Sequence, residues 1–201
     1  WLQNASRPMT TAFNSVSLYR KVRRVNLIAL SVVGSALLLQ VPVSAISIRM
    51  SPIGAPLMIA LFIALGLPSA LGFGLSSGLP AHESVAARRI CRFDAVLVAT
   101  SVGAFLVLGA IGALVSAGIN SSDVGETYLI ATRALMTYLG WLLVARFFVG
   151  WRTASIAPAL YLLAVGVFGF ADETAAAGWA WIGLPANDGW AWACTRILLG
   201  L

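Results

Sequence analysis

Two apolar runs near the start of the chain limit what it can fold into more than any other feature. The runs cover residues 25–48 and 53–76, and each contains 24 residues. A helix of that length measures about 36 Å, whereas the hydrocarbon core of a bilayer is about 30 Å thick. Only 10% of the residues are charged, compared with about 25% in a soluble domain, so a water-facing surface cannot be covered. We therefore predict an all-α integral membrane protein.

Further apolar segments follow, and the sequence predicts six spans within a single transmembrane domain over residues 1–201. The predicted spans cover residues 25–48, 53–76, 93–118, 127–149, 155–170 and 190–201. Before the last span, residues 172–189 are apolar but interrupted by glycines and a proline. We predict that they form one or two half-helices that enter the outer leaflet and return, covered there by protein. Trp179 and Trp181 fit the aromatic belt expected at this interface.

Basic residues gather in alternate loops between the predicted spans. Ten of the 13 Lys and Arg residues flank the first span or lie in the loops after the second and fourth spans: Arg7, Arg20, Lys21, Arg23, Arg24, Arg88, Arg89, Arg92, Arg146 and Arg152. The other loops hold Asp123, Glu126, Asp172, Glu173 and Asp188. The positive-inside rule then predicts cytoplasmic N- and C-termini in the cell inner membrane. Because topology accounts for the net charge of +6, we do not expect nucleic-acid binding.

The segment over residues 10–24 combines apolar side chains with a terminal cluster of cations. Such a helix can lie in the membrane surface, with its cations near anionic lipid headgroups. The residues predicted to take part are Tyr19, Arg20, Lys21, Arg23 and Arg24. The alternative is a flanking charge cluster that only orients the first span.

The stretch LPAHESVAARRICRFD, residues 79–94, concentrates charge in an otherwise apolar chain. Its spacing is helical, because Pro80 suits a first turn and Ala86 and Ile90 share one apolar face. We predict a short cytoplasmic helix that leads into the third span, with a solvated loop as the alternative. His82 is the only histidine, and without a second ligand at metal spacing it indicates neither a metal site nor a catalytic site.

Arg133 and Arg196 lie inside the predicted fourth and sixth spans, where a charge is costly unless it snorkels, pairs or lines a water path. One interpretation is that both reach toward acidic residues at the outer interface. The other is that they line a substrate path or outer gate together with Trp179 and Trp181. The sequence does not decide between these two interpretations.

The order of these segments resembles the permease subunits of type-2 ABC exporters. The residues that carry the resemblance are SLYRKVRR (17–24), PAHESVAARR (80–89) and ETAAAGWAWIGLPANDGWAW (173–192). In that family they correspond to an interfacial helix, a coupling helix and a re-entrant segment before the last span. The resemblance implies coupling to a cytoplasmic ATPase through His82, Glu83, Ser84, Arg88 and Arg89.

The resemblance also implies a multi-subunit complex in the bilayer. A second permease, identical or related, is expected to complete the substrate path. No Walker A loop is present in the sequence, so no cofactor is expected on this chain, and ATP with Mg²⁺ is expected on the partner ATPase. The chain itself is therefore expected not to be an enzyme.

Two alternatives come from other classes of protein. A six-span substrate-binding module of a vitamin or metal uptake transporter would also lack ATPase motifs. A membrane-embedded enzyme is less favoured, because no paired carboxylates or histidine clusters occur at membrane depth.

Overall fold

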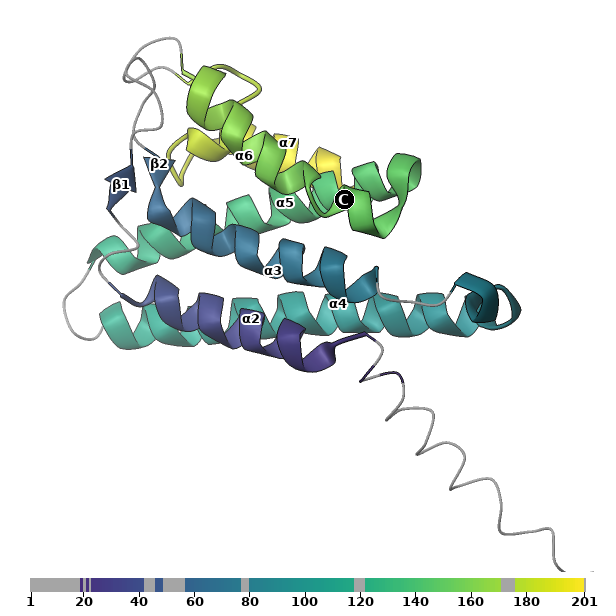
Figure 1. The fold of residues 1–201 in the computed structure, drawn as a ribbon. Helices are drawn as coiled ribbons and strands as arrows, with labels where there is room; N and C mark the ends of the chain where they lie inside the picture. The colour runs from purple at the N-terminus through teal and green to yellow at the C-terminus, as the bar shows by residue number, and fades with distance from the viewer. Residues whose placement is uncertain are drawn as a thin grey trace, which may run out of the picture.

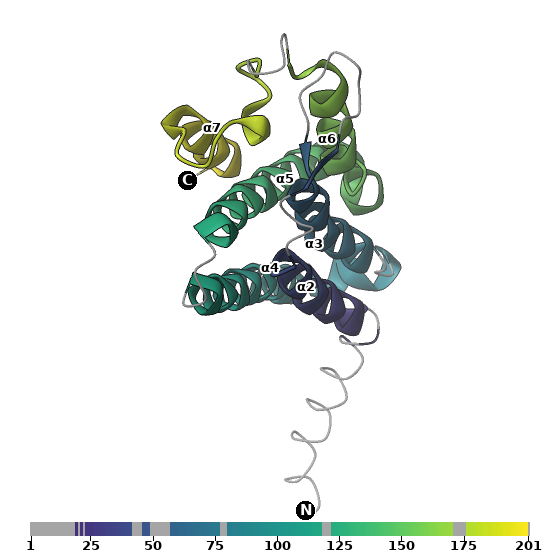
Figure 2. The same cartoon turned by 90° about the vertical axis from the view of Figure 1, so that its left-hand side faces the viewer.

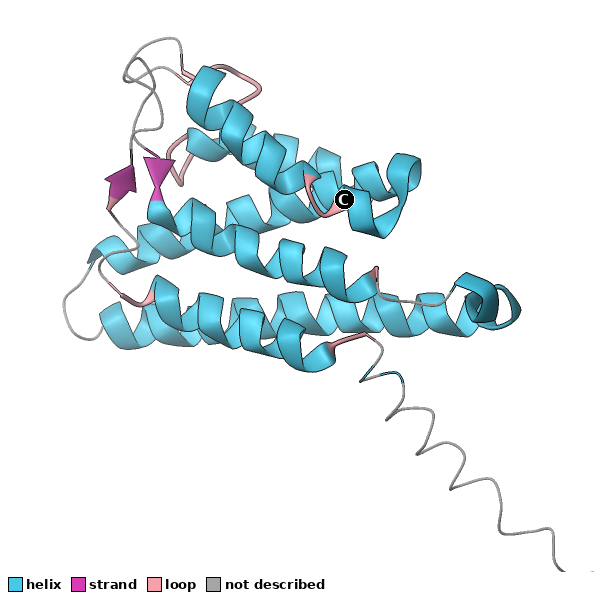
Figure 3. Ribbon diagram, in the orientation of Figure 1, coloured by secondary structure: helices cyan, strands magenta, loops and turns pink. Residues whose placement is uncertain are grey.

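A computed structural model of the chain describes residues 19, 21, 23–41, 46–48, 57–76, 80–117, 122–170 and 176–200, with only the backbone for residues 80–91, 116–117 and 122–124. The described part is all-helical except for one short antiparallel strand pair, which confirms the all-α class (Figure 3). The elements are α2 (Val25–Leu39), β1 (Ser47–Ile48), β2 (Leu57–Met58), α3 (Ile59–Leu75), α4 (Pro80–Ala117), α5 (Ser122–Ala154), α6 (Ala157–Phe168), the 3₁₀ helix η2 (Trp181–Gly183) and α7 (Gly189–Leu199).

The helices run antiparallel to one another in chain order and form three layers. Viewed along the bundle, α2 and α4 make one layer, α3 and α5 the next, and α6 and α7 the third (Figures 1 and 2). The middle layer is the centre of the fold, since α3 and α5 pack against each other and α5 also contacts α4, α6 and α7. Its apolar core includes Leu67, Leu71, Leu135 and Leu142, all of them buried.

This antiparallel course gathers most of the described cations at one end of the bundle. One end, here called the basic end, holds Lys21, Arg23, Arg24, Arg92, Arg146 and Arg152. The opposite end holds Glu126 and Asp188 among the described side chains. The folded chain thus brings together the basic loops that the sequence predicts on one side of a membrane.

Two helices are long and apolar enough to cross a membrane, within α4 at Arg92–Val115 and within α5 at Gly125–Ala154. The prediction of six spans is not supported, because α2, α3, α6 and α7 have only 15, 17, 12 and 11 residues. Only 17% of the apolar window in α4 is buried inside the chain. A core helix of a soluble protein would be mostly buried, so the apolar surface of α4 favours contact with lipid.

The predicted first and second spans are too long, for reasons found in the local backbone. The Gln40 amide donates to the Leu37 carbonyl, and this shorter bond closes α2. Pro42 follows in the sequence, and the residue before a proline is disfavoured in the α region. Within the described part of the second predicted span, Leu57 and Met58 form strand β2, and the helix begins at Ile59.

The boundaries of α4 and of the regular part of α5 agree better with the sequence. The helix predicted to begin at Pro80 is confirmed, and it continues without interruption into the apolar segment that follows. The regular part of α5 ends at the predicted position, because Gly150 has φ 76° and ψ 169°. That conformation is accessible essentially only to glycine.

The prediction of half-helices within residues 172–189 is wrong for the part that the structure describes. Residues 176–188 contain a single helical turn, η2, and otherwise irregular backbone. Some carbonyl groups of this segment accept from its own amides, as Pro185 does from Asp188, but no regular helix occupies them all, so other elements can also donate to them. α7 then begins at Gly189, where the Asp188 carboxylate caps it by accepting from the Ala191 amide at 2.9 Å.

Candidate functional site

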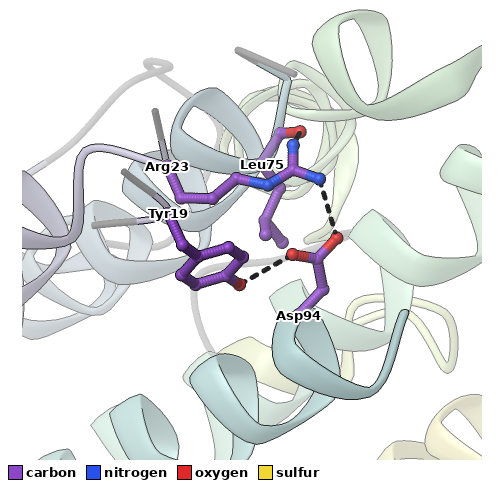
Figure 4. A network of polar contacts seen from close by, with 4 residues as sticks. All are labelled: Tyr19, Arg23, Leu75 and Asp94. Atoms are coloured by element: carbon purple, nitrogen blue, oxygen red, sulfur yellow. Dashed lines mark hydrogen bonds and ion pairs between the residues drawn. The ribbon is translucent and has the colours of Figure 1, made fainter. Parts of the chain in front are cut away.

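A buried polar cluster at the basic end joins three separate parts of the chain. The Tyr19 hydroxyl donates to Oδ1 of Asp94 at 2.8 Å, and Nη2 of Arg23 lies 3.1 Å from Oδ2 of the same carboxylate (Figure 4). Nη1 of Arg23 donates to the Leu75 carbonyl at 2.6 Å. We call these four residues the Asp94 cluster.

Three members of the Asp94 cluster lie at the end of α3 or in the turn before α2, whereas Asp94 itself lies within α4. Leu75 is the last residue of α3, where carbonyl groups have no partner within the helix, and an arginine can satisfy them. The turn before α2 presents Tyr19 and Arg23 on one side, since the Arg23 amide donates to the Tyr19 carbonyl at 2.9 Å. Arg24 then adopts a left-handed conformation, φ 49°, that redirects the chain into α2.

Burial makes the ion pair of the Asp94 cluster strong and sensitive to the loss of either partner. Arg23 is 3% exposed and Asp94 is 7% exposed. Removing one partner from such a pair leaves an uncompensated buried charge, at a cost of about 3–5 kcal/mol. Burial and the hydrogen bond to Asp94 also raise the pKa of Tyr19 well above its ordinary value, so this hydroxyl stays a donor.

The residues predicted for the interfacial helix have different surroundings. Arg23 is buried and faces Asp94 rather than lipid headgroups. Lys21 and Arg24 are exposed, and the guanidinium of Arg24 lies 4.7 Å from the centre of the Phe73 ring. Arg20 and residues 10–18 lie outside the described part of the chain.

The predicted coupling residues all lie on the first three turns of α4. They are His82, Glu83, Ser84, Arg88 and Arg89, and their side chains lie outside the described part. This part of α4 extends past the adjacent ends of α2 and α3 (Figure 1). Asp94 follows on the same continuous helix. The fold therefore connects the protruding turns directly to the Asp94 cluster.

A second buried cluster, near the opposite end, is built around Arg133 on α5. Nη1 of Arg133 donates to the Pro185 carbonyl at 2.7 Å, and Nη2 donates to the carbonyls of Ile182, at 3.4 Å, and Leu184. The arginine is 0% exposed. Its guanidinium group binds the irregular segment to α5.

The acidic residues predicted as partners of Arg133 do not bond to it in the described part. Glu126 is exposed, and Asp188 caps α7. Asp172 and Glu173 lie outside the described residues. Arg196 is exposed in the last turn of α7, one position after Thr195, whose hydroxyl contacts that of Thr137 on α5.

The two predicted gate tryptophans differ in their contacts. Trp181 is partly buried, and its indole N–H donates to the Thr137 hydroxyl at 3.2 Å. The Thr137 hydroxyl also lies 3.0 Å from the Thr195 hydroxyl, which links α5 to α7. Trp179 is exposed, but its carbonyl accepts from the Tyr161 hydroxyl at 3.0 Å. These bonds, with those of Arg133, attach the irregular segment to α5 and α6.

The sequence reasoning missed Asp94 as a functional residue. Its signal was present, since an acidic residue at the start of an apolar segment is expensive and usually has a partner. The partner was not predictable, because Arg23 is one of several cations that flank the first apolar run.

Among the residues that the structure describes, no group of three or more His, Cys, Asp or Glu side chains could hold a metal ion.

Comparison with protein-family models, with curated proteins and with solved structures finds no match to this chain. The functional reading therefore depends on the two clusters and on the course of the helices.

Proposed function

We propose that this chain is a permease subunit of an ATP-driven exporter in the cell inner membrane. Six membrane segments, two long and four short, would have cytoplasmic N- and C-termini, with the basic end facing the cytoplasm. The single observation that carries the proposal is the continuity of α4, which runs from protruding turns at the basic end through Asp94 into an apolar segment.

Because α4 is one unbroken helix, a displacement of its first turns would also displace its apolar part. A partner that binds the turns with His82, Glu83, Ser84, Arg88 and Arg89 would move the apolar part of α4 with them. The Asp94 cluster would carry the same movement to the end of α3 and to the turn before α2, through the two bonds of Arg23. A loop joined to the bundle by flexible backbone could not act in this way.

The energy would come from cytoplasmic ATPase subunits that bind ATP with Mg²⁺. Two permease copies, identical or related, would enclose the substrate path, and nucleotide binding would rock their bundles. The apolar interior suits a lipophilic or amphipathic cargo.

At the opposite end, the segment held by Arg133 would form an outer gate. Its attachment by backbone carbonyls of residues 182, 184 and 185 would let it detach as one unit when α5 shifts. Trp181 would move with it, because its indole bonds to the same helix. Arg196, which is exposed, would contribute little to this gate.

The experiment that tests the proposal is affinity purification of the full chain from its native membrane. We expect an ATPase with a Walker A motif to co-purify, and the variant Arg88→Glu/Arg89→Glu to lose it while the chain still inserts into the membrane. Arg196→Glu is the matched control, because it reverses an exposed charge away from the protruding turns.

Three results would contradict the proposal. Recovery of the ATPase with the double variant would exclude coupling through α4. Recovery of an additional scaffold subunit between the chain and the ATPase would instead favour an uptake module. Absence of any ATPase, together with a catalytic activity of the chain alone, would favour an enzyme.

A further inference from the structure

We propose that residues 146–152, with the sequence RFFVGWR, form a binding site for the headgroup of an anionic phospholipid. The segment lies at the basic end, where α5 meets the turn before α6 (Figure 1). It depends on the membrane location of the proposed function but not on an ATPase or on export.

The segment brings a cation and an indole together through a break in the helix. The guanidinium carbon of Arg146 lies 4.0 Å from the centre of the Trp151 ring. In a regular helix, side chains five positions apart point about 140° away from each other. Gly150, with φ 76° and ψ 169°, interrupts the helix between them. This break allows Trp151 to return over Arg146, in a cation–π geometry.

The two phenylalanines of the segment are exposed next to these cations. Phe147 is 87% exposed and Phe148 is 75% exposed. Their ring centres are 5.3 Å apart, so they form one apolar projection. No described element of the chain covers them. An apolar projection beside arginine and tryptophan is the composition expected at the boundary between headgroups and acyl chains.

The charge of the segment is not balanced by the described carboxylates. Only Asp94, Glu126 and Asp188 have described side chains among the acidic residues. Asp94 pairs with Arg23, and the other two lie at the opposite end of the bundle. The described carboxylates therefore leave Arg146 and Arg152 available to an anion from outside the described part of the chain.

The segment is also held in place, as a binding site requires. The turn that follows it packs against α3, where a side chain added at Gly72 would meet the Ser155 Cβ at 2.6 Å. The Ser155 hydroxyl donates to the Arg152 carbonyl at 2.7 Å, and Ala154 is fully buried. Arg152 thus projects from a fixed turn, near the end of a helix whose last residues include Arg146.

A phospholipid phosphate matches these groups better than a soluble anion does. Arginine recognises phosphate through several parallel N–H donors. Attraction of an arginine to an anionic leaflet contributes about a fivefold gain in binding. Only a lipid also supplies acyl chains for the exposed phenylalanines. We therefore expect one lipid to contact the two arginines through its phosphate and the two phenylalanines through its acyl chains.

The test uses the full chain, purified in a neutral detergent, and measures bound lipid by native mass spectrometry. Phosphatidylglycerol and phosphatidylcholine with identical acyl chains are the probes. We expect preferential retention of phosphatidylglycerol, and roughly a tenfold loss of that retention in Arg146→Gln/Arg152→Gln, as for the loss of one hydrogen bond to a charged group. Phe147→Ser/Phe148→Ser should weaken the binding of both phosphatidylglycerol and phosphatidylcholine, because it removes the apolar contact with the acyl chains. Arg196→Gln is the matched control and should retain phosphatidylglycerol as the unchanged chain does.

Other outcomes would overturn the assignment. Equal loss in Arg196→Gln would show attraction by overall charge instead of a site. Displacement of the lipid by inorganic phosphate at similar concentration would show a soluble-anion site. If the double variant elutes as an aggregate, the single variant Arg152→Gln is measured instead, because this exposed residue has no described packing role. An unchanged preference of Arg152→Gln for phosphatidylglycerol over phosphatidylcholine would refute the proposal.

Discussion

Arg23 and Asp94 are 71 positions apart in the chain, yet Nη2 of the arginine lies 3.1 Å from Oδ2 of the aspartate. This buried pair joins the turn before α2 to the helix that carries the protruding turns. The same arginine bonds to the Leu75 carbonyl, so three elements meet at one guanidinium group. Any displacement of α4 near Asp94 must therefore either move the other two elements or break the pair.

Asp94→Asn should destabilise the protein, because it removes the carboxylate that forms a buried ion pair with Arg23. We expect a loss of about 3 kcal/mol, which corresponds to a melting temperature lower by about 10 °C for a chain of this size. Thermal unfolding in detergent measures the change. Glu126→Gln is the control and should shift the melting temperature little, since Glu126 is exposed.

The same pair can be examined with a double-mutant cycle. Replacing both partners, as Arg23→Met/Asp94→Leu, removes the two charges together and should cost less than Asp94→Leu alone. The comparison requires unfolding free energies of both single variants and the double variant. Strict additivity would mean that the two residues do not interact in the folded protein.

Tyr19 should make the stability of the Asp94 cluster depend on pH in the alkaline range. Its pKa in the folded protein is raised by burial and by Asp94, whereas in the unfolded chain it is about 10. The folded state then binds more protons above pH 10, so the contribution of Tyr19 is complete below about pH 10 and declines at higher pH.

Tyr19→Phe tests this dependence. Below pH 10 the variant should be less stable by about 1 kcal/mol, the usual net contribution of one hydrogen bond. The difference in melting temperature between the two proteins should shrink as the pH rises from 9 to about 11. A constant difference over that range would contradict the raised pKa.

Arg133→Met should release the irregular segment from α5, because three backbone carbonyls lose their donor. Ile182 is 1% exposed, so a cysteine at this position reports the release. With Cys91 and Cys194 replaced by serine, Ile182→Cys should react slowly with a membrane-impermeant maleimide. Adding Arg133→Met should raise the rate at least tenfold.

A lysine at position 133 is the informative comparison. It keeps the charge, but a single ammonium group lacks the planar fork that reaches several carbonyls. The labelling rate of Ile182→Cys in Arg133→Lys should therefore lie between the rate with Arg133 unchanged and the rate in Arg133→Met. If Arg133→Met leaves the labelling slow, packing alone holds the segment.

Gly150→Ala should destabilise the junction between α5 and α6 by about 1–3 kcal/mol, because alanine is strained at φ 76° and ψ 169°. No atom lies within 4 Å of the added carbon, so the cost is conformational. Gly103→Ala is the matched control, since the added carbon is equally free but the residue is inside α4.

The two alanine substitutions should therefore have opposite signs. Gly103→Ala is expected to raise stability by about 0.5–1 kcal/mol, because alanine favours the helix. Unfolding in denaturant measures both variants. A destabilised Gly103→Ala together with an unchanged Gly150→Ala would contradict the helix break at residue 150.

The sequence by itself determined the all-α class, the start of α4 at Pro80 and the end of regular helix before Gly150. Each of these follows from a local property: hydropathy, or the backbone preferences of proline and glycine. The lengths of α2 and α3 were overestimated because hydropathy measures the preference of side chains for an apolar phase. It does not report where backbone hydrogen bonding stops.

Only the tertiary structure decided the partners of the buried charges. Arg23 is one of several cations near the first apolar run, and nothing local selects it for Asp94. Arg133 was expected near carboxylates, but it bonds to carbonyls that became accessible because residues 182–185 do not form a regular helix. A buried charge must be paired or hydrogen-bonded. Which acceptors lie close enough depends on how the helices pack, and the local sequence does not specify this.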